Sequence, residues 1–309
     1  MIPDNKKTLT IVSPCFNEAE ILEKFWLLLS PVVSQLSTEL IIKVLFVNNG
    51  STDSTLDVLK SISNKSQEVN FITLSRNFGY QGALDAGIRS CEADLYCIID
   101  ADGEDPPELL FEFHQAILNG ADLAYGVRKL RHESRFRSYL RKFFYRTVFL
   151  IADDPFNIDA GEFSMFTDEL KKAALHENNS FPFLRASLAR VGFTSIGIPH
   201  ERNPRLGGTS RLNAMAMANF AVGGALSSST YPLRLALYLL PLNVAMAIGF
   251  LISGVVLQSM VPIQLAIFFL LLIVVVQLSF VSVYLARTYK NGLFRPASFT
   301  HTNKSMIDL

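Results

Sequence analysis

Asp100 and Asp102 stand one residue apart directly after an apolar run, and their carboxylates are the groups of this chain best suited to chemistry. The run at residues 95–99 has the length and composition of a strand buried in a parallel sheet. In open α/β sheets, ligands bind beyond the carboxyl ends of the strands. Carboxylates placed there can hold Mg²⁺ or Mn²⁺, while substrate phosphates complete the coordination shell. The spacing therefore predicts a metal and phosphate site.

The same stretch also has the pattern of a helix start. Asp105 is followed by two prolines, which is typical of a capping residue before the first turn of a helix. We therefore expect Asp105 to cap a helix at residues 107–118. Capping does not account for Asp100 and Asp102, so the metal site and the cap are expected together.

The elements that must position these residues alternate between strand and helix patterns. Short apolar runs predict strands at residues 9–13, 41–47, 71–74, 95–99 and 123–127, and a late strand at 194–199. Helical spacing of apolar residues predicts helices at residues 18–36, 54–63, 80–89 and 107–118. This alternation is typical of an α/β fold with a mostly parallel, doubly wound sheet. We interpret residues 153–166 as a polar segment.

The composition limits the class of protein. The chain has 309 residues, 50% of them hydrophobic, and its formal net charge is zero. This length favours about two domains, and the charge balance argues against nucleic acid as the main partner, because such a partner requires a basic face. Three cysteines without metal-ligand spacing are expected to be small buried side chains in a reducing compartment. The N-terminus lacks the apolar core of a signal peptide, so we expect the soluble part to stay in the cytoplasm.

Two long apolar segments follow the soluble part. Residues 235–257 and 263–286 carry no charge, and each exceeds the roughly 20 residues needed to span a bilayer. The link between them is short, which predicts a transmembrane hairpin. Basic residues flank the outer ends of the spans and none lies in the link, so the positive-inside rule places both ends in the cytoplasm. Two buried helices of a soluble domain are the alternative.

A basic and aromatic segment at residues 128–146 follows the strand predicted at 123–127. Arginine and lysine interleave there with phenylalanine and tyrosine, which is typical of an amphipathic segment at a membrane surface. A solvated basic helix is the alternative. The side chains expected at lipid head groups are Arg135, Arg137, Arg141 and Lys142.

These features divide the chain into three parts. We expect a cytoplasmic catalytic domain at residues 1–210, a juxtamembrane amphipathic segment at 211–233, and two spans with a cytoplasmic tail at 234–309. Small residues in the first span, among them Gly249 and Gly254, permit close helix packing. They are compatible with a homo-oligomer and equally with packing inside the hairpin.

The loops at residues 14–18, 48–53, 76–79 and 100–104 together resemble those of the family 2 glycosyltransferases, which have the GT-A fold. Within that family the chain is similar to the polyisoprenyl-phosphate glycosyltransferases, typified by dolichol-phosphate mannose synthase and the bactoprenol glucosyltransferases. The resemblance covers essentially the whole chain and includes the two C-terminal spans. It implies an inverting sugar transfer from a sugar nucleotide to a polyprenyl phosphate, assisted by Mg²⁺ or Mn²⁺.

The resemblance also implies a nucleotide pocket. Its residues are Pro14, Asn17, Glu18, Asn48, Asn49, Ser51, Arg76 and Asp100. Asn48 and Asn49 stand where the family has two aspartates. An amide can still donate and accept hydrogen bonds, but it lacks the charge, so the choice of nucleotide stays open.

Metal and catalytic roles follow from the same resemblance. The implied metal ligands are Asp100, Asp102 and Glu104, with Glu104 in place of the family's glutamine. Residues 159–163 resemble the family's Asp-x-Gly-Asp-Phe segment, so we expect Asp159 to be the base or positioning residue, with Glu162 as the second candidate. Because a lipid phosphate is already ionised near neutral pH, an acid there orients the acceptor more than it deprotonates it. A loop cap is the alternative.

Phosphate groups of donor and acceptor require cations, and the planar guanidinium of arginine suits phosphate oxygens. The residues expected in this role are Arg128, Arg131, Arg202, Ser210 and Arg211, with Arg211 in place of the family's lysine. The sequence does not say which of them bind the donor and which bind the acceptor. The five histidines show no ligand spacing and are expected to be incidental.

The expected activity is transfer of a hexose to undecaprenyl phosphate or a related polyprenyl phosphate. Glucose from UDP-glucose is the first expectation, and GDP-mannose or UDP-aminoarabinose are the alternative donors. The expected location is the cytoplasmic face of the plasma (inner) membrane. A membrane protein that binds a nucleotide without catalysis, or one that helps to translocate a lipid, is the alternative from another class.

Overall fold

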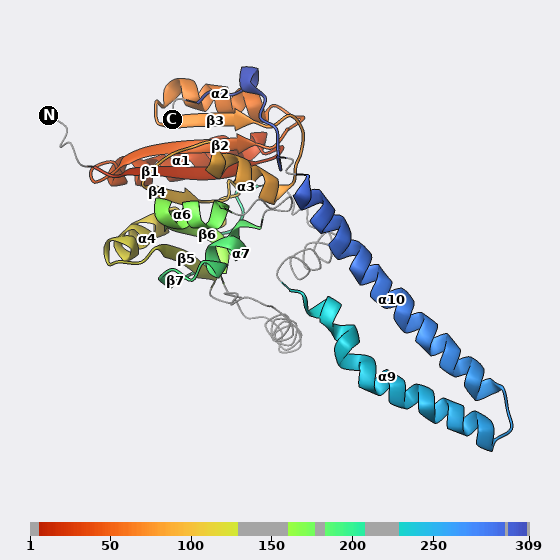
Figure 1. Ribbon diagram of the computed structural model, residues 1–309. Coiled ribbons are helices and arrows are strands. Elements are labelled where there is room, and N and C mark those ends of the chain that lie inside the picture. Colours follow the sequence, from red (N-terminus) through yellow and green to blue (C-terminus); the bar gives the residue numbers. More distant parts are fainter. Residues whose placement is uncertain (1–5, 129–159, 177–182, 208–228, 294–295, 308–309) are drawn as a thin grey trace.

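The computed structural model describes residues 6–128, 160–176, 183–207, 229–293 and 296–307. Within these residues the strands form one seven-stranded sheet in the order β3-β2-β1-β4-β6-β5-β7 (Figure 1). The strands are β1 (Thr8–Cys15), β2 (Ile41–Asn48), β3 (Val69–Thr73), β4 (Leu95–Ile98), β5 (Leu123–Arg128), β6 (Ala160–Thr167) and β7 (Ser195–His200). The six strands predicted from apolar runs are all confirmed, with ends shifted by a few residues.

Strand β6 was not predicted, and it changes the sheet. The pairs β1–β2, β2–β3, β1–β4 and β5–β7 are parallel, as expected for a doubly wound sheet. By contrast, β6 lies between β4 and β5 and is antiparallel to both. Part of the segment that we interpreted as merely polar therefore lies in the centre of the sheet.

Helices cover both faces of the sheet. One face packs against α1 (Ala19–Leu36), α2 (Thr55–Lys65) and α4 (Leu109–Leu118), and the other against α3 (Tyr80–Arg89), α6 (Asp168–Leu175) and α7 (Leu184–Arg190). Alternate residues of a strand enter the two cores, because side chains of an extended chain point to opposite faces. Val44 and Phe46 of β2 lie in the first core, and Leu45 and Val47 lie in the second.

Two helices after the sheet are long and apolar enough to cross a membrane, judged by length and composition. They are α9 (Tyr231–Val256) and α10 (Val261–Gly292), and they run side by side as a hairpin away from the sheet (Figure 1). The rings of Phe250 and Phe269 stack between them with centroids 6.1 Å apart. Most large apolar side chains of both helices are exposed, which disfavours the alternative of two buried core helices.

The chain returns from α10 to the sheet. Its last described residues form a tail at 296–307, which contains a short 3₁₀ turn (Thr302–Lys304) and runs along the free edge of β3. Antiparallel bridges join Phe71 to Met306 and Leu74 to Thr300. Both ends of the helical hairpin therefore lie on the side of the sheet (Figure 1).

Candidate active site

Polar loops gather at the carboxyl edge of the central strands. The last residues of β1 and β2 are paired, since Cys15 lies opposite Asn48, and Asn48 lies opposite Thr73 at the end of β3. Asp100 follows β4 at the same edge, because Val12 of β1 pairs with Ile98. The register of the sheet thus brings together the four loops whose residue types indicated chemistry.

The first two loops are hydrogen bonded to each other. Asn17 has a positive φ of 53°, a conformation that asparagine tolerates better than most residues. Its backbone nitrogen donates to Oγ of Ser51 over 2.9 Å, and its side-chain Oδ1 accepts from the backbone nitrogen of Thr52 over 2.7 Å. Asn17 and Ser51, both predicted at the nucleotide, are therefore neighbours. Pro14 lies one position before the end of β1.

Asn49 holds the third loop in place. Its buried amide donates to Oδ1 of Asn77 over 3.2 Å and to the carbonyl of Gly79 over 3.0 Å, and its Oδ1 accepts from the nitrogen of Phe78 over 2.9 Å. A carboxylate could make only the last of these three bonds. Asparagine in place of the family's aspartate at this position therefore has a structural reason.

The neighbouring Asn48 is also buried and uses its side chain internally. Its Oδ1 accepts from the backbone nitrogen of Ser51 over 3.1 Å, and its amide reaches Oγ1 of Thr73 at 3.5 Å. Arg76 stacks its guanidinium over the ring of Phe78, 4.0 Å from the centroid. Asn48 thus orients the second loop, and Arg76 lies on the third.

The acidic residues of the site, Asp100, Asp102, Glu104, Asp105 and Glu162, form an acid cluster. Two residues at the start of α3 donate hydrogen bonds to it. The hydroxyl of Tyr80 donates to Oδ1 of Asp100 over 2.6 Å, and Nε2 of Gln81 donates to Oε1 of Glu162 over 3.0 Å. Burial raises the pKa of Asp100 to about 7; the Tyr80 hydrogen bond lowers it, and the charges of Asp102 and other acids raise it further. Burial likewise raises the pKa of Glu162.

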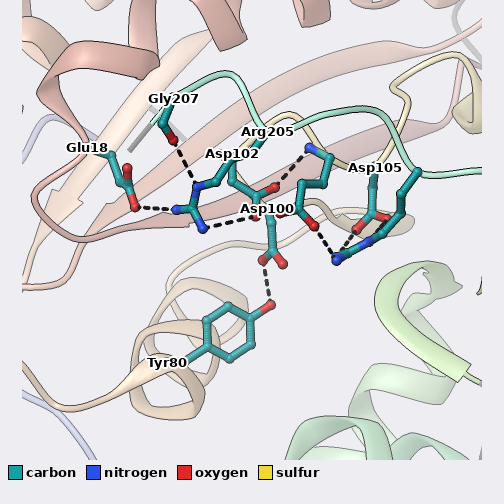
Figure 2. A network of polar contacts seen from close by, with 9 residues as sticks. Glu18, Tyr80, Asp100, Asp102, Asp105, Arg205 and Gly207 are labelled. Carbon is teal, nitrogen blue, oxygen red and sulfur yellow. Dashed lines mark hydrogen bonds and ion pairs between the residues drawn. The ribbon is translucent and has the colours of Figure 1, made fainter. Parts of the chain in front are cut away.

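The loop after β7 places the guanidinium of Arg205 between Glu18 and Asp102 (Figure 2). Nη2 of Arg205 donates to Oε1 of Glu18 over 3.1 Å, and its Nη1 lies 3.9 Å from Oδ2 of Asp102. Its Nε donates to the carbonyl of Gly207 over 3.0 Å, which fixes the guanidinium. Arg205 therefore connects a predicted nucleotide residue with a predicted metal ligand.

Backbone bonds hold this loop against the acids. The nitrogen of Asn203 donates to the carbonyl of Glu104 over 2.8 Å, and that of Leu206 donates to the carbonyl of Asp102 over 3.1 Å. Gly103 has a φ of +72°, and an added Cβ would lie 2.5 Å from the Leu206 side chain. The positive φ favours glycine at this position, and a side chain there would also require Leu206 to move.

Asp105 does not cap the helix, and this prediction was wrong. Helix α4 begins later, at Leu109, and the carboxylate of Asp105 is buried against His200 and Arg202. Nε2 of His200 lies 3.0 Å from Oδ1 of Asp105, and Nε of Arg202 donates to the same oxygen over 3.1 Å. These hydrogen bonds overcome the effect of burial and hold the pKa of Asp105 at about 2. A histidine that we expected to be incidental thus belongs to this network.

The three carboxylates predicted as metal ligands contact different partners in this structure, and their metal role stays a prediction. The carboxylate of Glu104 pairs with the guanidinium of Arg202, and no group of three or more His, Cys, Asp or Glu side chains able to hold a metal occurs among the described residues. Asp100 and Asp102 supply two carboxylates. That donor set fits Mg²⁺ or Mn²⁺ bound jointly with substrate phosphates, because Mg²⁺ is usually held by one or two carboxylates and phosphate oxygens. It does not fit a cage built from protein ligands alone.

Other predicted residues are distributed as follows. Arg128 is the last residue of β5. Its Nε lies 3.8 Å from the point that a Cβ on Gly161 of β6 would occupy, and its charge acts on Glu162, the next residue of that strand. The residues that lie outside the described ones are Arg131, Asp159, Ser210, Arg211 and the basic segment at 129–146. Their roles stay predictions.

Four residues of the site were missed by the sequence analysis: Tyr80, Gln81, His200 and Arg205. A signal existed for Arg205. The family that the sequence resembles has a segment Arg-x-x-Gly-x-Ser-Lys in this loop, and Arg205, three residues before Gly208 and five before Ser210, fits its spacing better than Arg202 does. Tyr80, Gln81 and His200 belong to other elements than their partners, and no local pattern in the sequence indicates them.

Comparisons with known proteins show the family to which the chain belongs. Residues 10–191 match glycosyl transferase family 2. The chain is 33% identical over 234 residues to the uncharacterized glycosyltransferase YkcC of Bacillus subtilis, covering 74% of this chain and 71% of that protein. It is 27% identical over 234 residues to the bactoprenol glucosyl transferase of Shigella phage SfV, covering 75% of each.

A solved structure shares the fold. The crystal structure of glucosyl-3-phosphoglycerate synthase from Mycobacterium tuberculosis superposes with a TM-score of 0.50 at 19% identity, covering 72% of this chain and 80% of that one. The expected GT-A fold, a mixed sheet with helices on both faces, is thereby confirmed. The match to glycosyl transferase family 2 covers more than half of the chain. The chain therefore belongs to this family and is a glycosyltransferase.

Proposed function

We propose that this glycosyltransferase moves a hexose from a sugar nucleotide to a polyprenyl phosphate at the cytoplasmic face of the plasma (inner) membrane. Glucose from UDP-glucose is the first donor to test, and undecaprenyl phosphate is the first acceptor. The observation that carries the proposal is that the domain with Asp100 and Asp102 at its sheet edge is followed by two apolar helices, and that the chain after these helices returns to the same sheet. A catalytic edge held at a membrane surface suits an acceptor that is itself a membrane lipid.

The nucleotide is proposed to bind across the loops that end β1, β2 and β3. Asn17, Ser51 and Asn49 fix these loops through side-chain hydrogen bonds, so the pocket is largely preorganised. Preorganisation lowers the entropy lost when a ligand binds. Glu18 and Arg76 remain the side chains at its rim that are proposed to contact the donor.

Asp100 and Asp102 are proposed to hold Mg²⁺ or Mn²⁺ together with the donor diphosphate. When bound, the metal ion would stabilise the negative charge that collects on the leaving nucleoside diphosphate. Arg205 supplies a positive charge beside Asp102 and Glu18, where the same diphosphate would meet it. A fixed guanidinium is well suited to phosphate oxygens.

The transfer itself exchanges one bond for another. An oxygen of the acceptor phosphate forms a bond to the anomeric carbon, while the bond from that carbon to the donor diphosphate breaks and its electron pair leaves with the nucleotide. Attack from the face opposite the leaving group inverts the anomeric configuration. We propose that Glu162, held by Gln81, and Asp159 orient the acceptor, and that Arg128 and Arg131 bind its phosphate. Ser210 and Arg211 are proposed at the phosphates of either substrate.

The lipid acceptor has support from the relatives as well. A bactoprenol glucosyl transferase is among the proteins that this chain resembles over three quarters of its length. The hairpin of α9 and α10 suits an anchor for such an activity, because both helices are long enough to span a bilayer. Because the hairpin has two spans, the domain before it and the tail after it would lie on the same side of the membrane. The catalytic edge would then face the lipid phosphate that is presented on that side.

Purified protein in detergent or nanodiscs, incubated with labelled UDP-glucose, undecaprenyl phosphate and Mn²⁺, tests the proposal. We expect lipid-linked label that is lost when EDTA is added. GDP-mannose and UDP-aminoarabinose, used in parallel, identify the donor if glucose is not transferred. Absence of lipid-linked label with all three donors, beside an active control enzyme, would contradict the acceptor assignment. Tight UDP binding without any turnover would instead favour a nucleotide-binding protein that does not catalyse transfer.

A further inference from the structure

The tail at residues 296–307 is bonded to β3 more firmly than a loose terminus requires. Phe71 exchanges two backbone hydrogen bonds with Met306, at 3.0 and 2.8 Å, and the nitrogen of His301 donates to the carbonyl of Thr73 over 2.7 Å. The nitrogen of Ser75 donates to the carbonyl of Phe299 over 2.8 Å. The tail thereby covers an edge strand, and its contacts continue beyond the strand to the loop that follows it.

A ring contact carries the tail into that loop. The rings of Phe299 and Phe78 have centroids 6.2 Å apart at an interplanar angle of 48°, within the range of favourable aromatic pairs. The ring of Phe78 also carries the guanidinium of Arg76, and its backbone nitrogen donates to Asn49. Phe78 therefore connects a tail residue with two residues of the proposed nucleotide pocket.

A second path runs through Thr73. Its Oγ1 donates to the carbonyl of Lys304 over 2.8 Å and receives the amide of Asn48 at 3.5 Å. Its backbone nitrogen donates to Oγ of Ser305 over 3.0 Å. Asn48 orients the loop at residues 48–51 through Ser51, so the tail is linked to this loop indirectly, through Thr73 and Asn48.

Protection of an edge strand is a simpler role for the tail. An exposed edge strand is a hazard for aggregation, and a tail that only covers it would explain the backbone bonds. It would not explain Phe299. This side chain is 57% exposed, so it contributes little to a core, and the ring that it contacts belongs to the loop and not to β3.

We propose that the tail is a positioning clasp for the nucleotide loops, with Phe299 as the residue that orients the loop at 76–79. The proposal deepens the proposed function and rests on it, because the loops are taken to bind the donor. Since α10 leads directly into the tail, the same contacts tie the proposed membrane anchor to the donor pocket. When the hairpin is inserted in the membrane, the tail would then hold the loops at residues 48–51 and 76–79 in the conformation that binds the nucleotide.

The matched variants are Phe299→Ala, which removes the ring, and Phe299→Tyr, which keeps it. Ile307→Ala, at another exposed tail residue, is the control. Hydrogen exchange of the full-length protein without ligand is the first readout, because the amides of Phe78 and Gly79 are held by Asn49 and Asn77. UDP affinity with Mn²⁺ and the steady-state constants for the donor identified by the transfer assay are the second.

For Phe299→Ala we expect faster exchange at Phe78 and Gly79 and weaker UDP binding, each by about 2- to 10-fold, the range of an aromatic pair of this kind. The donor KM should rise by a similar factor, while kcat and the acceptor KM stay unchanged. Phe299→Tyr and Ile307→Ala should behave like the unaltered protein. Exchange in the centre of β1, at Val12, should not change.

Unchanged exchange at Phe78 and Gly79 in Phe299→Ala would overturn the proposal. So would faster exchange throughout the sheet with a lower melting temperature, because the tail would then only stabilise the fold. If the unaltered protein fails to bind UDP or any donor, the proposed function is what fails, and the exchange experiment still decides whether the tail orders the loop.

Discussion

The hydroxyl of Tyr80 donates a hydrogen bond to Oδ1 of Asp100 over 2.6 Å. This contact joins the first residue of α3 to the loop after β4, and so it fixes one carboxylate of the candidate metal pair from outside its own loop. Burial and the neighbouring acids raise the pKa of Tyr80, so the phenol stays protonated and remains a donor. Tyr80 is thus a positioning residue for Asp100.

Replacing Tyr80 by phenylalanine should weaken metal binding. Partners that orient a metal ligand typically contribute about 10- to 100-fold to metal affinity, and Tyr80→Phe removes only the hydroxyl. We expect the Mn²⁺ affinity of the UDP complex, measured by electron paramagnetic resonance, to fall by about 10-fold. Tyr289→Phe, at an exposed position of α10, is the control and should leave the affinity unchanged. Equal affinities in both variants would show that Asp100 needs no such orientation.

Asp102→Asn should abolish most of the transfer while preserving the fold. Oδ1 of Asp102 accepts from the nitrogen of Glu104 over 3.0 Å, and an asparagine oxygen can keep that bond. The variant therefore loses the charge and little else. We expect the rate of transfer to fall by about 10²- to 10³-fold, as for other groups that stabilise transition-state charge, with an unchanged melting temperature. Asp57→Asn, at an exposed residue of α2, should stay active, and full activity of Asp102→Asn would refute the proposed metal role.

Asn49→Asp should loosen the loop at residues 76–79, although it restores the family's residue. The carboxylate would face Oδ1 of Asn77 and the carbonyl of Gly79 as an acceptor against acceptors. Loss of two buried hydrogen bonds costs about 1–3 kcal/mol, so we expect a lower melting temperature and weaker UDP binding. Asn64→Asp adds the same charge at an exposed position of α2 and serves as the control. A melting temperature as high as that of the control would mean that the loop does not depend on the amide.

His114 should make the stability of the soluble domain depend on pH. Its side chain is buried in α4, and burial lowers its pKa in the folded state, although Glu39, 3.5 Å away, opposes the shift. As the pH falls below about 6.5, the unfolded chain takes up a proton before the folded protein does. The contribution of His114 to the free energy of unfolding is therefore fully present above that pH. It decreases as the pH falls toward the pKa of His114 in the folded state.

Melting temperatures measured between about pH 5 and pH 8 test this linkage. His114→Gln cannot titrate and should remove the contribution of His114, so that below about pH 6.5 its melting temperature falls less on acidification than that of the unaltered protein. His176→Gln, at an exposed histidine, should keep the slope of the unaltered protein. If His114→Gln retains that slope as well, another group causes it.

The sequence by itself determined the alternating part of the fold. Apolar runs and helical spacing located β1 to β5 and α1 to α4, because each of these elements buries its own regular face. Strand β6 escaped, since Gly161, Glu162 and Ser164 interrupt its apolar residues. Only the assembled sheet shows that Phe163 and Phe166 of this strand enter the two cores from between β4 and β5.

The candidate site divides in the same way. Asp100 and Asp102 could be placed at the carboxyl edge of the sheet from the sequence, because they directly follow an apolar run that predicts a strand. Their partners depend on tertiary structure: Tyr80 lies 20 residues from Asp100, and Arg205 lies 187 residues from Glu18. Asp105 illustrates the reason. Its local pattern indicated a helix cap, but a buried carboxylate needs hydrogen-bonding or oppositely charged partners, and the fold supplies Arg202 and His200, which lie 97 and 95 residues further along the chain.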